Sequence, residues 1–132
     1  MTDDELFRRF DAGTLPSGDF HHRDHVRVAF LYLCKYPALE ALGRFSIALK
    51  KLAVAAGKPD LYHETITWAF MLLIRQRIAA AREDRHPDWT EFSNANPDLL
   101  DWKENILKRY YRSETLASPQ ARATFQFPDK LA

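Results

Sequence analysis

The chain has only one cysteine, Cys34, among its 132 residues. A single cysteine cannot form a disulfide within the chain, so a fold held together by disulfide bridges is excluded. Cys34 lies in the apolar run VAFLYLCKY, and no activating base is adjacent to it in the sequence. We therefore expect a reduced, packed thiol and not a reactive nucleophile.

An excess of charge of either sign is also missing. The chain has 19 Lys and Arg against 18 Asp and Glu, for a formal net charge of +1. Both signs are scattered along the sequence and do not gather in blocks, as is typical of an ordinary solvated surface. Neither nucleic acid nor an anionic membrane is therefore an expected partner.

Long hydrophobic runs are absent as well. No apolar stretch approaches the ~18–20 residues that a membrane-spanning helix needs. The first ten residues, MTDDELFRRF, are acidic and lack a basic region followed by an apolar segment, so they do not resemble a signal peptide. These features predict a soluble, cytoplasmic protein.

Alternating β-type runs are missing, whereas apolar residues recur with helical spacing. The sequence therefore predicts an all-α fold, a single helical domain over residues 1–132 built as a bundle of about five to six helices with an up-down-up core. Thr2 and Glu5 form a capping-box pattern for the first helix, and Asp60 is the expected cap of the fourth. The expected helices run from 3 to 13, 22 to 36, 38 to 56, 61 to 82, 97 to 110 and from 119 onward, with one helical turn near 89–92.

Four of the five histidines lie in two short stretches, FHHRDH at 20–25 and YHETIT at 62–67. His22 and His25 are three residues apart and share one helix face, and His63 begins the apolar row of the fourth helix. Short links make neighbouring helices antiparallel, so the second and fourth helices should begin at the same end of the bundle. We therefore expect these three histidines to meet.

Three converging imidazoles predict a metal site. Neutral imidazole binds zinc and iron well, and three protein ligands leave a position open for water or substrate. Such a site favours a metal-dependent enzyme, a hydrolase or an oxygenase, acting on a small molecule. Asp24 and Glu64 are candidates for a fourth ligand, for an acid/base group, or for a charge that merely favours a helix N-terminus. Spacing does not decide between three histidines and two histidines with a carboxylate.

Three further residues are expected to contact the substrate. Tyr62 and Thr67 flank His63, and Tyr32 lies below the His22 and His25 pair, where its buried hydroxyl needs a partner. An alternative function uses the same residues without catalysis: a ligand-binding or protein-interaction module in which the histidine cluster is structural.

The run FHHRDHVRVAFLYL, followed by YHETITWAF and later by NPDLL and RYY, resembles a poorly characterised family of small bacterial helical proteins. That family carries an FxHxxH motif and a YHxTxT motif. The resemblance attaches no reaction, substrate or cofactor to the matched motifs, which contain Phe20, His22, His25, Tyr62, His63, Thr65 and Thr67.

Overall fold

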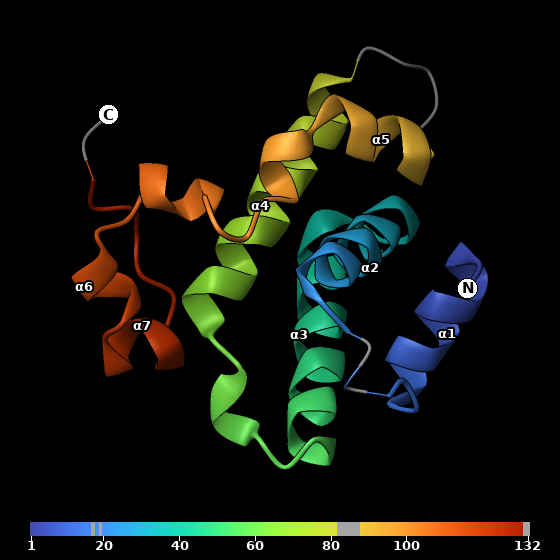
Figure 1. Cartoon of the computed structure of the whole chain (residues 1–132), viewed down its shortest axis with the longest axis horizontal. Helices are drawn as coiled ribbons and strands as arrows, with labels where there is room; N and C mark the ends of the chain where they lie inside the picture. The colour runs from blue at the N-terminus through green and yellow to red at the C-terminus, as the bar shows by residue number, and fades with distance from the viewer. Residues whose placement is uncertain (17, 19, 82–87, 131–132) are drawn as a thin grey trace.

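The computed structural model describes residues 1–16, 18, 20–81 and 88–130, and these residues form helices and no strands (Figure 1). The all-helical class predicted from the sequence is thus confirmed. The α-helices are α1 (Asp3–Ala12), α2 (His22–Lys35), α3 (Ala38–Ala55), α4 (Glu64–Ala80), α5 (Trp89–Ala95), α6 (Ser113–Leu116) and α7 (Pro119–Ala123). The short 3₁₀-helices η2 (Pro59–Leu61), η3 (Pro97–Leu99) and η4 (Ile106–Arg109) lie between them.

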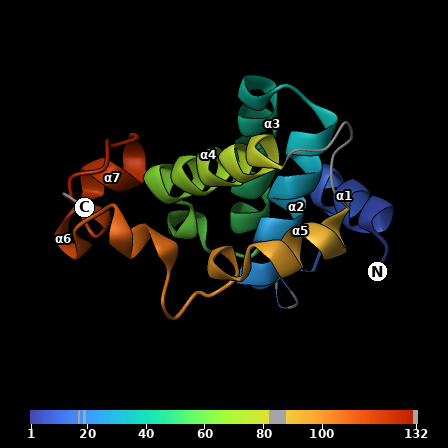
Figure 2. The same ribbon diagram turned by 90° about the horizontal axis from the view of Figure 1, so that it is seen from above.

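Helices α2, α3 and α4 form the centre of the molecule and contact one another. In Figure 1, α3 and α4 run in opposite directions, as expected, whereas α2 is seen nearly end on and therefore lies across them. Helix α1 packs on α2 and α3, and α7 packs on α4. Figures 1 and 2 show that α1 and α7 lie at opposite sides of this centre, so these two helices flank it.

The first helix begins and ends as its sequence predicts. The Thr2 hydroxyl accepts a hydrogen bond from the Glu5 amide at 3.1 Å, and Gly13 ends α1 in the left-handed conformation with φ 75°. Glycine adopts this conformation without the steric penalty that a Cβ brings.

The predicted start of the fourth helix was wrong. Pro59–Leu61 form the separate turn η2, and α4 begins at Glu64 with His63, not Asp60, as its N-cap. The ring Nδ1 of His63 accepts a hydrogen bond from the Ile66 amide at 3.1 Å. An N-cap side chain binds a free amide of the first helical turn in this way. The expected end at 82 lies outside the described residues.

The predicted fifth helix over 97–110 was also wrong. It is divided into η3 and η4, because polar side chains between them bind backbone amides that a continuous helix needs. Asp101 accepts from the Glu104 amide at 3.0 Å, and Asn105 accepts from the Leu107 amide at 2.8 Å. The turn expected near 89–92 is instead the seven-residue helix α5, and Asp88 caps it. The short helix α6 was not predicted from the sequence.

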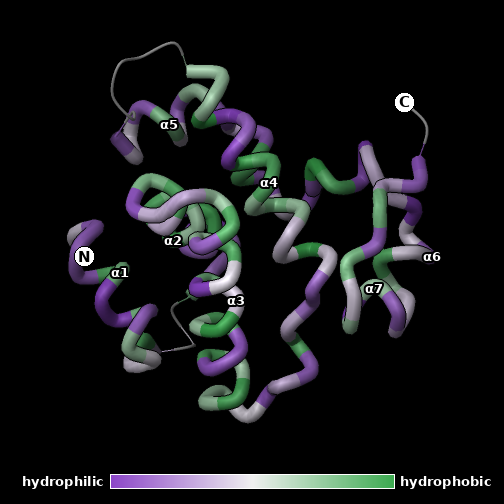
Figure 3. The backbone as a smooth tube through the Cα atoms, turned by 180° about the vertical axis from the view of Figure 1, so that it is seen from behind, coloured by the Kyte–Doolittle hydropathy of each residue, from purple (hydrophilic) through white to green (hydrophobic). Residues whose placement is uncertain are grey.

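The apolar faces of the helices meet in one hydrophobic core. Figure 3 shows apolar and hydrophilic residues following each other in bands along α3, the pattern of a helix with one buried face. Cys34 is half-buried beside this core, and burial raises the pKa of its thiol to about 11, so the thiol is protonated at neutral pH. None of the helices in the described ranges combines the length and the apolar character that crossing a membrane requires.

An arginine fork ties α4 to the segment that follows α5. Arg77 donates to both carboxylate oxygens of Asp98 at 3.0 and 2.8 Å and to the side-chain oxygen of Asn96 at 2.7 Å. Bidentate pairs of this kind are stronger than single hydrogen bonds. We expect Arg77→Met to lower the free energy of unfolding by about 1.5 kcal/mol, measured by urea titration. As a control, Arg44→Met removes the exposed pair with Glu40 and should leave the free energy of unfolding nearly unchanged, because exposed ion pairs contribute little.

Candidate ligand-binding pocket

A pocket of about 520 Å³ lies between α2, α3 and α4. Most of its wall is apolar, and α3 and α4 contribute the side chains of Phe45, Leu49, Leu52, Ile66, Phe70 and Ile74. Trp102 and Arg122 add to the wall from the C-terminal third of the chain. The volume lies within the range of ~300–1,000 Å³ that is usual for sites of small molecules.

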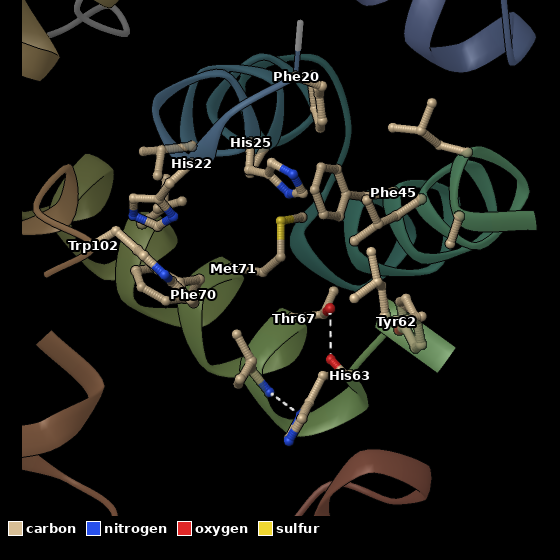
Figure 4. A pocket seen from close by; sticks show the side chains of 18 of the residues that line it. Phe20, His22, His25, Phe45, Tyr62, His63, Thr67, Phe70, Met71 and Trp102 are labelled. Carbon is tan, nitrogen blue, oxygen red and sulfur yellow. Dashed lines mark hydrogen bonds between the residues drawn. The ribbon is translucent and has the colours of Figure 1, made fainter. Parts of the chain in front are cut away.

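His25 is the polar group that enters the middle of this pocket. In Figure 4 its ring extends from the first turn of α2 toward the sulfur of Met71, and it packs against Phe20 with ring centroids 4.2 Å apart. No described residue forms a hydrogen bond with either ring nitrogen. Burial, assisted by the neighbouring His22, lowers the pKa of His25 to about 4. The imidazole is therefore neutral at pH 7 and offers one donor and one acceptor.

His22 forms the pocket wall and has one ring nitrogen engaged. Its Nε2 lies 2.9 Å from the carbonyl oxygen of Leu99. Because a carbonyl only accepts, Nε2 carries the proton and Nδ1 is the acceptor in the neutral ring. Burial lowers the pKa of His22. Its ring packs against Phe70 and Trp102, with centroids 5.0 and 4.8 Å away, and so joins α2 to the segment after η3.

His63 lines the same pocket, but both nitrogens of its ring form hydrogen bonds within the protein. Nδ1 caps α4 through the Ile66 amide, and Nε2 donates to the carbonyl oxygen of Leu116 at 2.7 Å. In Figure 4 the ring is directed away from the middle of the pocket, toward the C-terminal segment. Burial lowers the pKa of His63, so the neutral form that makes both hydrogen bonds predominates at pH 7.

The predicted metal site requires these three histidines to turn their free nitrogens to one point. Both nitrogens of His63 are engaged, and one nitrogen of His22 is engaged. Within 1–16, 18, 20–81 and 88–130, no group of three or more His, Cys, Asp and Glu side chains is arranged to hold a metal ion. The arrangement thus gives no support to the zinc or iron site, which stays a prediction.

The two carboxylates proposed as acid/base groups bind neighbouring donors outside the pocket wall. Glu64 Oε1 accepts from the Tyr62 hydroxyl at 2.5 Å and from the Trp68 ring nitrogen at 3.1 Å. Asp24 accepts from the His21 amide at 3.0 Å. Both lie in the first turn of their helices, where negative charge is favourable. Their positions favour the helix-terminus interpretation.

The predicted substrate-contacting residues are divided between pocket and core. Tyr62 and Thr67 line the pocket. The Thr67 hydroxyl donates to the carbonyl oxygen of His63 at 2.7 Å, and burial raises the pKa of Tyr62 to about 12. Tyr32 is not in the pocket wall. It is fully buried between α1 and α2, where its hydroxyl finds the partner it needs in Asp11 at 2.7 Å.

Met71 and Arg122 are among the pocket residues that the sequence did not reveal. Met71 was assigned only to the apolar row of its helix, and Figure 4 places its sulfur in the middle of the pocket. Arg122 was not considered, because it comes from α7 and reaches the pocket only when the C-terminal segment folds back on α4. Met71 had a local signal, since it follows His63 on the same helix face. Arg122 had none.

Comparison of the chain with known protein families, with curated proteins and with solved structures found no match. The site is therefore interpreted from its own geometry, and the resemblance to the FxHxxH and YHxTxT family stays untested.

Proposed function

We propose that this protein binds a small, largely apolar molecule in the pocket between α2, α3 and α4, with His25 as the hydrogen-bonding group that orients it. The position of His25 is the observation that carries the proposal. A neutral imidazole projects into a mostly apolar pocket, and no described residue pairs with it. His25 is half-buried, and its ring nitrogens are left free by the described residues, so they can bind a polar group of a molecule that enters the pocket.

The expected ligand is apolar over most of its surface and carries a hydroxyl, carbonyl or carboxyl group. The apolar side chains of α3 and α4 favour a hydrocarbon or ring body. His25 fixes the orientation of the ligand's polar group, because the neutral imidazole both donates and accepts. A small molecule as partner and the cytoplasm as location carry over from the sequence as parts of this proposal.

Metal-dependent hydrolysis or oxidation was the leading prediction from the sequence. In the described part of the chain, no observation favours it over simple ligand binding. Elemental analysis of untagged protein tests it directly. A stoichiometric transition metal that is lost in a His22→Ala/His63→Ala variant would restore that prediction.

Substitution of His25 tests the proposal, with 1-octanol as the probe and calorimetry as the measurement. We expect His25→Leu to weaken octanol binding about tenfold, the equivalent of one lost hydrogen bond. His25→Gln keeps a donor and an acceptor and should stay within about threefold of the wild type. His21→Gln, which alters the exposed neighbouring histidine, is the matched control and should change nothing.

The same variants separate a functional from a structural histidine. If His25 serves a ligand, it makes no hydrogen bond that the fold needs, and His25→Leu should change the free energy of unfolding at pH 7 by less than about 1 kcal/mol. Weaker folding of the leucine variant together with unchanged octanol binding would make His25 a structural residue and end the proposal.

A further inference from the structure

The charges around the pocket restrict the kind of ligand. No Asp or Glu is among the residues that line it, and Arg122 contributes the one formal charge of that wall at neutral pH. The three histidines of the wall are neutral there, because burial lowers the pKa of each. An anionic group therefore meets a positive charge in this pocket, whereas an ammonium group meets no carboxylate.

Arg122 is held at the pocket by one nitrogen only. Its Nη1 donates to the carbonyl oxygens of Asp60 and Tyr62, the second at 3.3 Å. These bonds fix the guanidinium beside η2 without neutralising it, and no carboxylate pairs with Arg122 in the described ranges. The other two nitrogens, Nε and Nη2, form no hydrogen bond with any described residue. Together they form the edge of the guanidinium that binds a carboxylate through two parallel hydrogen bonds.

We infer that the ligand is an organic acid with an apolar body, whose carboxylate pairs with Arg122 while the body fills the pocket toward Met71. This inference rests on the proposed function and adds to it the class of ligand. A hydroxyl or carbonyl group on the body would then meet His25. The pairing gives the ligand one orientation, since Arg122 lies on α7 and the imidazole of His25 lies on α2.

The test compares three probes with the same eight-carbon chain: octanoate, 1-octanol and octylamine. We expect octanoate to bind about tenfold more tightly than octanol, because a charge-assisted pair is stronger than a neutral hydrogen bond. Octylamine should bind most weakly. Raising the NaCl concentration to 0.5 M should weaken octanoate binding and leave octanol binding unchanged, since salt screens a charge pair near the surface.

Variants of Arg122 assign the effect to this side chain. Arg122→Gln should remove the preference for octanoate and leave octanol affinity unchanged. Arg122→Lys keeps the charge but not the two parallel N–H donors of the guanidinium, so it should retain part of that preference. Arg8→Gln removes one exposed positive charge from α1, across the molecule from α7 (Figure 1), and controls for net charge. If Arg122→Gln does not fold, the salt dependence of octanoate binding to the wild-type protein still tests the charge pair.

The outcomes distinguish the two proposals. If octanol and octylamine bind as well as octanoate, and Arg122→Gln changes none of them, the organic-acid inference is overturned while the proposed pocket function stands. If none of the three probes binds, the proposed function fails and the inference fails with it.

Discussion

His63→Ala is expected to lower the free energy of unfolding by about 3 kcal/mol. The substitution removes the N-cap of α4, which leaves the Ile66 amide without its acceptor, and it removes the donor to the Leu116 carbonyl. Loss of a cap accounts for about 1 kcal/mol, and the half-buried carbonyl of Leu116 and the space left by a ring that is only 6% exposed account for the remainder. Urea titration followed by circular dichroism measures the change.

His63→Asn is the matched control, because asparagine is among the best N-cap residues and cannot replace the bond to Leu116. We expect it to recover about 1 kcal/mol of the loss. Equal destabilisation by Ala and Asn would contradict the capping role, and a loss below about 1 kcal/mol in the alanine variant would contradict the structural assignment of His63 as a whole.

The His63 bond belongs to a larger attachment of the C-terminal segment to α4. Thr65, which is fully buried, donates to the carbonyl oxygen of Ala121 at 2.7 Å and accepts from the Gln126 amide at 3.0 Å. This attachment brings α7, and with it Arg122, to the pocket. Removing His63 should therefore also increase hydrogen exchange in the segment from α6 to α7.

Acidification from pH 7 to pH 5 is expected to lower the free energy of unfolding by about 2 kcal/mol through His25 alone. In the unfolded chain His25 binds a proton near its ordinary pKa of 6.5, whereas in the folded protein it does so only near 4. Between these values the unfolded state holds more protons, so stability is present above pH 6.5 and is lost as the pH falls toward 4. The cause is burial first and the adjacent His22 second, and the carboxylate of Asp24 opposes them only in part.

The pH dependence of the His25→Leu variant isolates this contribution. His22 and His63 also have lowered pKa values and act in the same direction, so the variant should keep a smaller acid loss than the wild type. Urea titrations at pH 7, 6 and 5 measure it. Identical pH dependence in the two proteins would mean that His25 titrates normally in the fold, and its position in an apolar pocket would then need revision.

Local spacing predicted the elements with strong helical signals and the face of α2 that carries the site. His22 and His25 share that face because they are three residues apart, and both line the pocket with His63. The short links between helices predicted that His63 would join them, and it lines the same pocket, but its ring is directed away from the middle. The predicted meeting of the three histidines is therefore not supported, and α2 lies across α3 and α4 in Figure 1 instead of completing an up-down-up core.

The roles of individual side chains were harder to predict, because each depends on a partner distant in sequence. His63 is not among the usual N-cap residues, and its second partner, Leu116, lies 53 residues away. The sequence predicted that Tyr32 contacts the substrate, because nothing in its own helix reveals that its hydroxyl binds Asp11. Arg122 reaches the pocket only through the folding back of the C-terminal segment, which short-range periodicity does not describe.

The two methionines of the chain allow the central claim to be tested by one spectrum. Met71 is buried with its sulfur in the middle of the pocket, and Met1 is 59% exposed and serves as an internal reference. Protein labelled with ¹³C at the methionine methyl groups would be titrated with octanoate and with 1-octanol. If the pocket is a ligand site, the Met71 methyl signal should shift until it saturates, while the Met1 signal does not move. In His25→Leu, a higher concentration of 1-octanol should be needed to reach the same shift. No shift of Met71 with either probe, or equal shifts of both methyl signals, would contradict it.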